Sequence, residues 1–157
     1  DDICIHGLIR NKRVVRYIDK KYIASSDSNI DEYKVLIPSA NGSGAIGEVL
    51  STPLIGAPLI GYTQSFISMG AFAAQCEAES CMKYIKTKFA RAMLGILKTT
   101  QHNPAATWRF VPIQDFSSSS DIDWSKPVSD IDSQLYSKYN LSDDEIEFIE
   151  SHIKPMD

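Results

Sequence analysis

The chain has 157 residues, a formal net charge of −4 and 43% hydrophobic residues, the composition of a globular protein the size of one ordinary domain. No apolar run approaches the roughly 18 residues that a membrane-spanning helix needs, which argues against a membrane protein. The charge is unevenly distributed, because residues 81–114 hold six basic and no acidic residues, whereas residues 115–157 hold eleven acids and three lysines. A local basic face on an acidic protein can attract nucleic acid.

The first half of the chain predicts short strands and loops. Two strands are expected within residues 3–22, on either side of a basic turn that carries Arg10, Lys12 and Arg13. A strand at residues 33–37 is stopped by Pro38. The other expected features, in chain order, are a polar loop at 25–29, a glycine-rich loop at 39–47, apolar segments at 50–55 and 59–62, and a strand at 63–69.

One long amphipathic helix is expected at residues 77–98. Its apolar residues recur at i, i+3 and i+4 spacing and form one stripe: Met82, Ile85, Phe89, Ala92, Met93, Ile96 and Leu97. Its basic residues, among them Lys88, Arg91 and Lys98, fall on the other side. A polar turn follows, and the alternation at residues 108–113 predicts a strand.

The acidic tail predicts a small helical pair. Residues 117–120 are a short serine linker, and a helix is expected from near Pro127 to about residue 139, with Asn140 at its C-terminal cap. Ser142 and Glu145 form a capping box that opens a last helix, to about residue 153. The order of elements gives an α+β fold, which we divide into an α+β domain at 1–116 and an acidic helical extension at 117–157.

The loop at residues 42–47 reads Gly-Ser-Gly-Ala-Ile-Gly, the G-x-G-x-x-G spacing that cradles a dinucleotide pyrophosphate. Pro53 and Pro58 interrupt any helix after it, and no acid between Glu48 and Glu77 is present to hold a ribose. A surface turn is therefore the default interpretation of the loop. Alternatively, Asn41 and Ser43 are small hydrogen-bonding groups that can approach a base edge or a phosphate.

The basic residues and the polar loop at 98–103 provide further candidate contacts with nucleic acid. A charge run is usually only a solvated helix face, but this one has no compensating acids at i, i+4 spacing. Thr100 and Gln101 have side chains suited to reading base edges. We expect phosphate contacts from Arg10, Lys12, Arg13, Lys88, Arg91 and Lys98.

Catalysis and metal binding find little support. The chain has no G-x-S-x-G, H-E-x-x-H or Gly-Lys-Ser/Thr motif. Cys76, Cys81 and His102 have a poor spacing for zinc. Three sparse cysteines favour free thiols in a reducing, cytoplasmic compartment. The first residues include no Met and no signal-peptide pattern, so we expect a piece of a longer polypeptide that is itself non-catalytic.

Seven phrases of the sequence resemble one protein family, and together they span most of the chain. They are residues 33–44 (YKVLIPSANGSG), 63–67 (TQSFI), 83–91 (KYIKTKFAR), 97–101 (LKTTQ), 108–116 (WRFVPIQDF), 121–125 (DIDWS) and 131–136 (IDSQLY). They are similar to the C-terminal region of bacterial type II, type IIG-like restriction–modification enzymes, which are adenine-specific DNA methyltransferases, some fused to endonucleases.

The resemblance implies a target-recognition domain, similar in style to the specificity subunits of type I restriction systems. Its expected partners are double-stranded DNA and an N-terminal methyltransferase domain of the same polypeptide, which would bind S-adenosylmethionine. The methyltransferase motifs Asn/Asp-Pro-Pro-Tyr and Phe-x-Gly-x-Gly are absent here, so no cofactor is expected in this chain. The alternative is a protein-interaction domain that assembles a restriction–modification complex, and a third hypothesis is a small-molecule enzyme that uses the glycine-rich loop.

Overall fold

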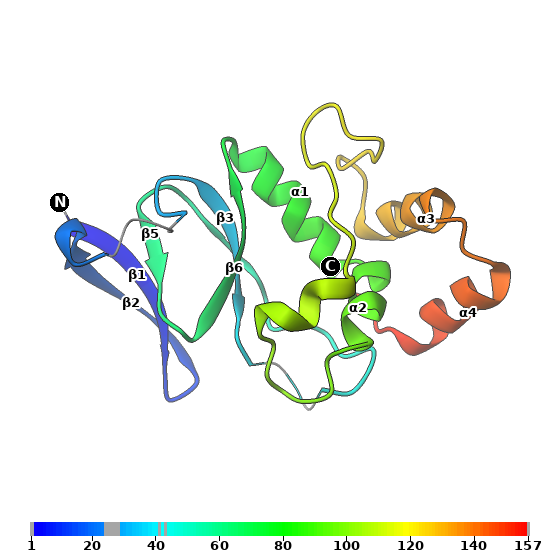
Figure 1. The fold of residues 1–157 in the computed structure, drawn as a ribbon, viewed down its shortest axis with the longest axis horizontal. Helices are drawn as coiled ribbons and strands as arrows, with labels where there is room; N and C mark the ends of the chain where they lie inside the picture. The colour runs from blue at the N-terminus through cyan, green and yellow to red at the C-terminus, as the bar shows by residue number, and fades with distance from the viewer. Residues whose placement is uncertain (1, 24–28, 41, 43, 157) are drawn as a thin grey trace.

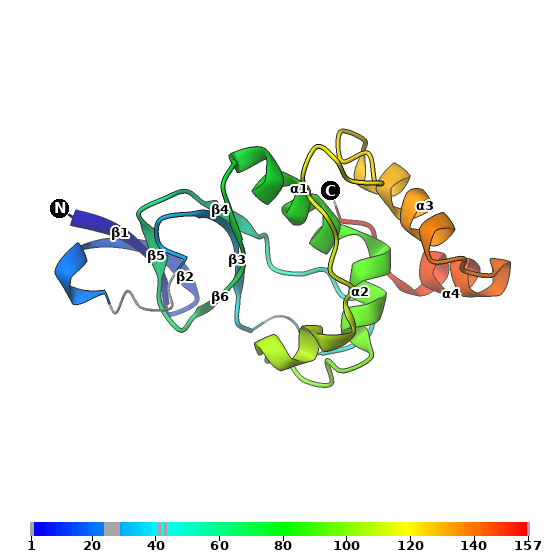
Figure 2. The same cartoon turned by 45° about the horizontal axis from the view of Figure 1, so that its top comes forward.

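The computed structural model describes residues 2–23, 29–40, 42 and 44–156, and it has the predicted α+β class (Figure 1). Two three-stranded sheets come first in the chain, and four α-helices with two short 3-10 helices complete the described part. In both views the strands β1, β2 and β5 lie at one end and the helices α3 and α4 at the other (Figure 1, Figure 2). No helix in the described ranges is long and apolar enough to cross a membrane.

The N-terminal sheet has the strand order β2-β1-β5 and confirms the predicted basic hairpin. Strand β1 (Asp2–Ile9) pairs antiparallel with β2 (Lys12–Asp19) over its whole length, and Arg10 and Asn11 form the turn. Strand β1 runs through Gly7 to Ile9 without a break. Strand β5 (Ile60–Tyr62) pairs parallel with residues 4–6 alone, so no third strand of the described ranges pairs with the ribbon beyond His6.

The second sheet, with the order β4-β3-β6, carries the core. Its central strand β3 (Tyr33–Pro38) confirms the prediction for this segment and is buried from Lys34 onward. Strands β4 (Leu54–Gly56) and β6 (Phe66–Phe72) pair antiparallel with it on either side. The apolar run of β3 is continuous because both faces of a central, covered strand are removed from water.

The prediction of one long helix at residues 77–98 is wrong, because two helices occupy this region. Helix α1 (Gln75–Lys86) ends at Thr87, and α2 (Lys88–Gly95) begins directly after it. Thr87 has ψ 149°, outside the helical region, and its hydroxyl accepts a hydrogen bond from the Ala90 N–H at 3.1 Å. A threonine that caps a new helix has a non-helical backbone, so the preceding helix ends at it. The spacing of the apolar residues does not reveal such a break.

The strand predicted at residues 108–113 is also wrong. Residues Ala105–Phe110 form a short 3-10 helix that begins after Pro104. The Thr107 hydroxyl stabilises its first turn, because it donates to the Pro104 carbonyl at 2.7 Å and lies 3.0 Å from Oδ1 of Asn103. The apolar residues of this segment do not share one buried face, since Trp108 packs on the core while Phe110 is exposed.

The two tail helices, α3 (Val128–Lys138) and α4 (Asp143–His152), are confirmed with their caps. Asn140 has a φ of 51°, and the two backbone bonds around it, Asn140 N–H to Ser137 and Leu141 N–H to Tyr136, form a Schellman motif. Ser142 and Glu145 make the predicted capping box.

The tail shares the core of the residues before it. Its buried residues form one hydrophobic cluster with β3, α1 and α2: Ile122, Trp124, Ile131, Leu135, Tyr136, Ile149 and Ile153. The predicted division between 116 and 117 is therefore not a boundary of the hydrophobic core.

Candidate nucleic-acid interface

Three segments that are distant in the sequence meet around one open surface cavity of about 450 Å³. The first segment is the β1–β2 hairpin, the second runs from the end of β3 through the glycine-rich loop, and the third is the polar loop after α2. The cavity is lined by Leu8, Asn11, Arg13, Pro38, Ala40, Gly42, Ser51 and Gln101. The structure thus brings together Arg13 and Gln101, which sequence reasoning had proposed separately.

The hairpin is attached to this cavity through Arg13. Its guanidinium donates a hydrogen bond to the backbone carbonyl of Thr52, 39 residues later. Arg10 and Lys12 are exposed beside it, and neither side chain has a hydrogen bond or an ion pair with the part of the chain that the structure describes. Two exposed cations near a polar cavity, without a partner among the described residues, are available to a phosphate.

Backbone contacts hold the polar loop against the end of β3. The Asn103 N–H donates to the Ser39 carbonyl at 2.8 Å, and Ala40 and His102 form an isolated antiparallel bridge. Thr100 and Gln101 are exposed on the loop so formed. Of the predicted base-reading residues, Asn41 and Ser43 lie outside the described residues.

The glycines of the G-x-G-x-x-G run serve close backbone packing. Gly44 has a φ of 91°, and a β-carbon there would lie 2.5 Å from the Thr100 nitrogen. Gly47 has a φ of 83°, and its β-carbon would lie 2.0 Å from the His152 carbonyl oxygen. The loop therefore packs against the polar loop and the C-terminal segment, which accounts for these two glycines without a pyrophosphate.

No protein-family model, curated protein or solved structure matches this chain. The candidate interface is accordingly defined by its own residues, their exposure and their charge.

Arg91 was expected on a solvated basic face, and that expectation is wrong, because only 3% of the residue is exposed. Its guanidinium donates to the backbone carbonyls of Lys86, Thr87, Glu48 and Lys154 at 3.1, 3.3, 3.4 and 2.5 Å. Burial lowers the pKa of Arg91, and the nearby Asp132 opposes this shift. A guanidinium keeps its proton in proteins, so the side chain stays charged and joins α2 to the glycine-rich loop and to the C-terminal segment.

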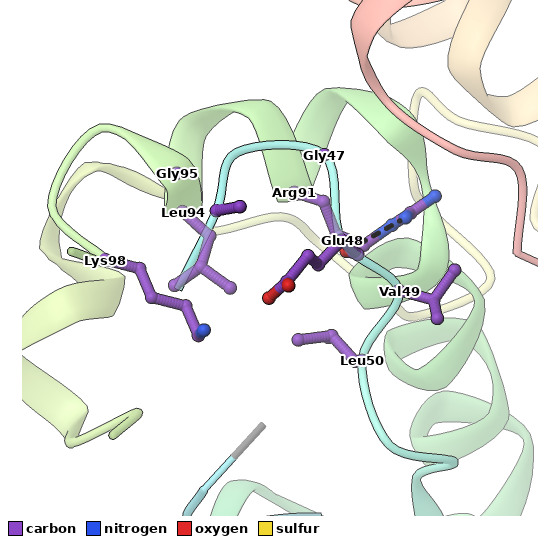
Figure 3. Close-up of a pocket in the computed structure, with 9 residues that line it drawn as sticks. Gly47, Glu48, Val49, Leu50, Arg91, Leu94, Gly95 and Lys98 are labelled. Atoms are coloured by element: carbon purple, nitrogen blue, oxygen red, sulfur yellow. Dashed lines mark hydrogen bonds between the residues drawn. The ribbon is translucent and has the colours of Figure 1, made fainter. Parts of the chain in front are cut away.

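Lys98 is the second correction, since it is 7% exposed and its ammonium donates to the Thr100 carbonyl at 3.1 Å. It lines a cavity of only about 20 Å³ together with Arg91, Glu48 and Leu94 (Figure 3). The dashed line in Figure 3 is the bond from Arg91 to the Glu48 backbone. A space of this size accommodates about one water molecule, so it is a packing gap rather than a ligand site.

Lys88 is the third correction, because an acid of the tail neutralises it. Its ammonium forms an ion pair with the Glu150 carboxylate and donates to the Glu150 carbonyl at 3.2 Å. Lys83, also on the basic side, donates to the carbonyls of Trp124 and Lys126 at 2.7 and 3.1 Å. Lys88 and Lys83 therefore bind the tail of the same chain. Of the six predicted phosphate contacts, Arg10 and Lys12 remain exposed and make no hydrogen bond or ion pair with the described residues.

Sequence reasoning missed Asn11. It lines the cavity at the tip of the hairpin with a φ of 60°. An asparagine between two predicted strands is a signal for a two-residue turn, and asparagine tolerates the left-handed conformation better than most residues. Among the described residues, no group of three or more His, Cys, Asp or Glu side chains is placed to hold a metal ion.

Proposed function

We propose that this chain is the DNA sequence-recognition domain of a restriction–modification, adenine-specific DNA methyltransferase, and that it is not catalytic by itself. The observation that carries the proposal is the meeting of the basic hairpin with the polar loop at one cavity. The sequence resemblance supplies the class of parent enzyme.

The chemistry of the surface supports binding to a nucleic acid. Arg10, Lys12 and Arg13 supply positive charge for phosphates, which fixes a protein on a duplex without reading its sequence. Gln101 and Thr100 present amide and hydroxyl groups that can pair with base edges. Charge for affinity and neutral polar groups for specificity thus occur together on one surface.

The remaining parts of the proposal concern the parent protein. We place S-adenosylmethionine in an N-terminal methyltransferase domain of the same polypeptide, and the tail helices would not face DNA because they carry seven acids and one lysine. A cytoplasmic location follows from the function, and it agrees with three cysteines that form no disulfide with one another.

A fluorescence-anisotropy titration with a random-sequence duplex tests the proposal. For three phosphate contacts, raising the salt from ~50 to ~200 mM should weaken binding by about fortyfold, because the logarithm of the affinity falls with the logarithm of salt by about 0.9 per contact. Absence of duplex binding at the lower salt would contradict the proposal.

An assembly domain is the second candidate, and an apolar groove favours it. The groove has a volume of about 380 Å³ and lies between β6, α1 and residues 108–116. Ile113 at its rim is 97% exposed, which is unusual for a large apolar side chain. This candidate predicts salt-tolerant association with another domain of the complex and no affinity for the duplex.

A further inference from the structure

The turn of the β1–β2 hairpin has an unfavourable residue at its first position. Arg10 and Asn11 have φ angles of 50° and 60°, and Ile9 and Lys12 are paired on either side, which defines a two-residue hairpin loop of the type I′ class. That loop requires positive φ at both central residues and strongly prefers Asn-Gly. Asn11 is compatible with this conformation, whereas an arginine β-carbon is strained there.

No contact within the described chain explains the choice of arginine. The Arg10 side chain is exposed and makes no hydrogen bond or ion pair with the described residues, in contrast to Arg13, which is bound to Thr52. Backbone strain that no internal contact offsets is found mainly at functional sites. The strained arginine therefore indicates an external partner at the tip.

The shape of the hairpin limits what that partner is. Beyond His6 no described strand pairs with the two-stranded ribbon, because β5 pairs only with residues 4–6, and the bond from Arg13 to Thr52 holds the ribbon against the rest of the chain. The turn lies at the far end of this ribbon from the N-terminus (Figure 1). A two-stranded β-ribbon fits the major groove of B-form DNA, whereas the minor groove is too narrow for it.

The side chains at the tip match the groove in chemistry as well. Arginine donates two parallel hydrogen bonds to guanine O6 and N7, and asparagine pairs with adenine N6 and N7. The guanine acceptors and the adenine donor–acceptor pair both face the major groove. Lys12, the next residue, is exposed and positioned to contact the flanking phosphates.

We propose that the Arg10–Asn11 turn enters the major groove of a DNA duplex and makes base contacts there. This inference rests on the proposed function and adds to it the groove and the two residues that read it. Gln101, which lines the same cavity as Asn11 and Arg13 near the turn, then contacts the same duplex.

The double variant Arg10→Asn/Asn11→Gly tests this inference, because it creates the turn that a purely structural hairpin would carry. We expect its melting temperature to equal or exceed that of the parent chain. Its affinity for a duplex pool selected on the intact protein should fall by about fivefold to a hundredfold. Lys21→Ala is the matched control for lost charge, since Lys21 is exposed at the other end of β2, and it should change binding little.

The groove itself is tested with the same duplexes carrying glucosylated 5-hydroxymethylcytosine, which fills the major groove and leaves the phosphates unchanged. The intact protein should bind these duplexes at least about fivefold more weakly, and the double variant should not distinguish them. Equal binding of both duplexes by the intact protein, or unchanged affinity of the double variant, would overturn the inference and leave the proposed function standing. Failure of the intact protein to bind any duplex would overturn both.

Discussion

Oδ1 of Asp132, on α3, accepts a hydrogen bond from the backbone N–H of Phe89, on α2, at 2.8 Å. Its other oxygen accepts from the N–H of Lys88 at 3.0 Å. These N–H groups belong to the first turn of α2, which has no intrahelical acceptors for them. A side chain of the tail thus supplies the hydrogen-bond acceptors at the start of a helix in the preceding region.

Asp132→Ala should lower the free energy of unfolding by about 1–3 kcal/mol, because it leaves two N–H groups at the start of α2 without their acceptor. Chemical denaturation followed by circular dichroism measures this change. Asp132→Asn keeps one acceptor oxygen and should cost less than the alanine variant. Equal stability of Asp132→Ala and the parent chain would show that the tail does not cap α2.

The Lys88–Glu150 pair should make part of the stability depend on pH. Burial raises the pKa of Glu150, but the hydrogen bonds from Lys88 and Tyr136 outweigh it, so the pKa lies below the ordinary value of 4.5. A group with a lowered pKa in the folded state contributes stability that is present above pH 4.5 and is lost as the pH falls through the folded pKa. The difference in unfolding free energy between the parent and Glu150→Gln should therefore shrink from pH 6 toward pH ~3. A constant difference over that range would contradict this assignment.

Arg91→Met should lower the free energy of unfolding and leave the duplex affinity of the folded protein nearly unchanged. The variant removes a charged donor from the carbonyls of Glu48 and Lys154, and bonds to charged groups contribute about 1.5–3 kcal/mol. Duplex affinity, corrected for the folded fraction at low temperature, should remain within about twofold of the parent, since the guanidinium is buried. A uniform loss of affinity with unchanged stability would instead restore Arg91 as a phosphate contact.

Gln101→Ala should relax sequence preference rather than abolish binding. If the Gln101 amide reads one base, its loss removes about 1–3 kcal/mol of discrimination at that position. Selection from a random duplex pool, followed by sequencing, measures this loss, and Thr100→Ser is a conservative control that keeps a hydroxyl on the same loop. An unchanged recognition profile for Gln101→Ala would remove Gln101 from the interface.

The elements with strong local signals were predictable from the sequence. Ser142 with Glu145, Asn140 and Pro38 each act through contacts within a few residues, so their spacing specifies the element boundary. The break at Thr87 was not predictable, because it depends on a hydroxyl cap and on Asp132, 45 residues later. The strand expected at 108–113 failed for a similar reason, since apolar alternation does not distinguish a strand from a short 3-10 helix.

The residue types of the candidate site were predictable from the sequence, but the predicted location of some of these residues was wrong. The sequence predicts that a basic residue on a helix is exposed to solvent. Instead, Arg91 binds the carbonyl of Lys154 and Lys88 binds the carboxylate of Glu150, each more than 60 residues away along the chain. Such partners depend on tertiary packing and leave no local pattern. Arg10 was placed correctly on a turn, because the strand alternation around it is a local signal, whereas Lys12 and Arg13 were expected on the turn and instead begin β2.

The salt dependence of duplex binding tests the central claim most directly, through two triple variants. One removes the hairpin cations, with Arg10, Lys12 and Arg13 changed to Ala, and the other removes Lys20, Lys21 and Lys126, which are exposed elsewhere. Both variants lose three positive charges, so a difference between their salt dependences depends on where the removed charges lie. We predict that the first variant flattens the slope of log affinity against log salt by about 2 to 3, while the second leaves it near the parent value. Equal slopes for the two variants would contradict a nucleic-acid interface at the hairpin.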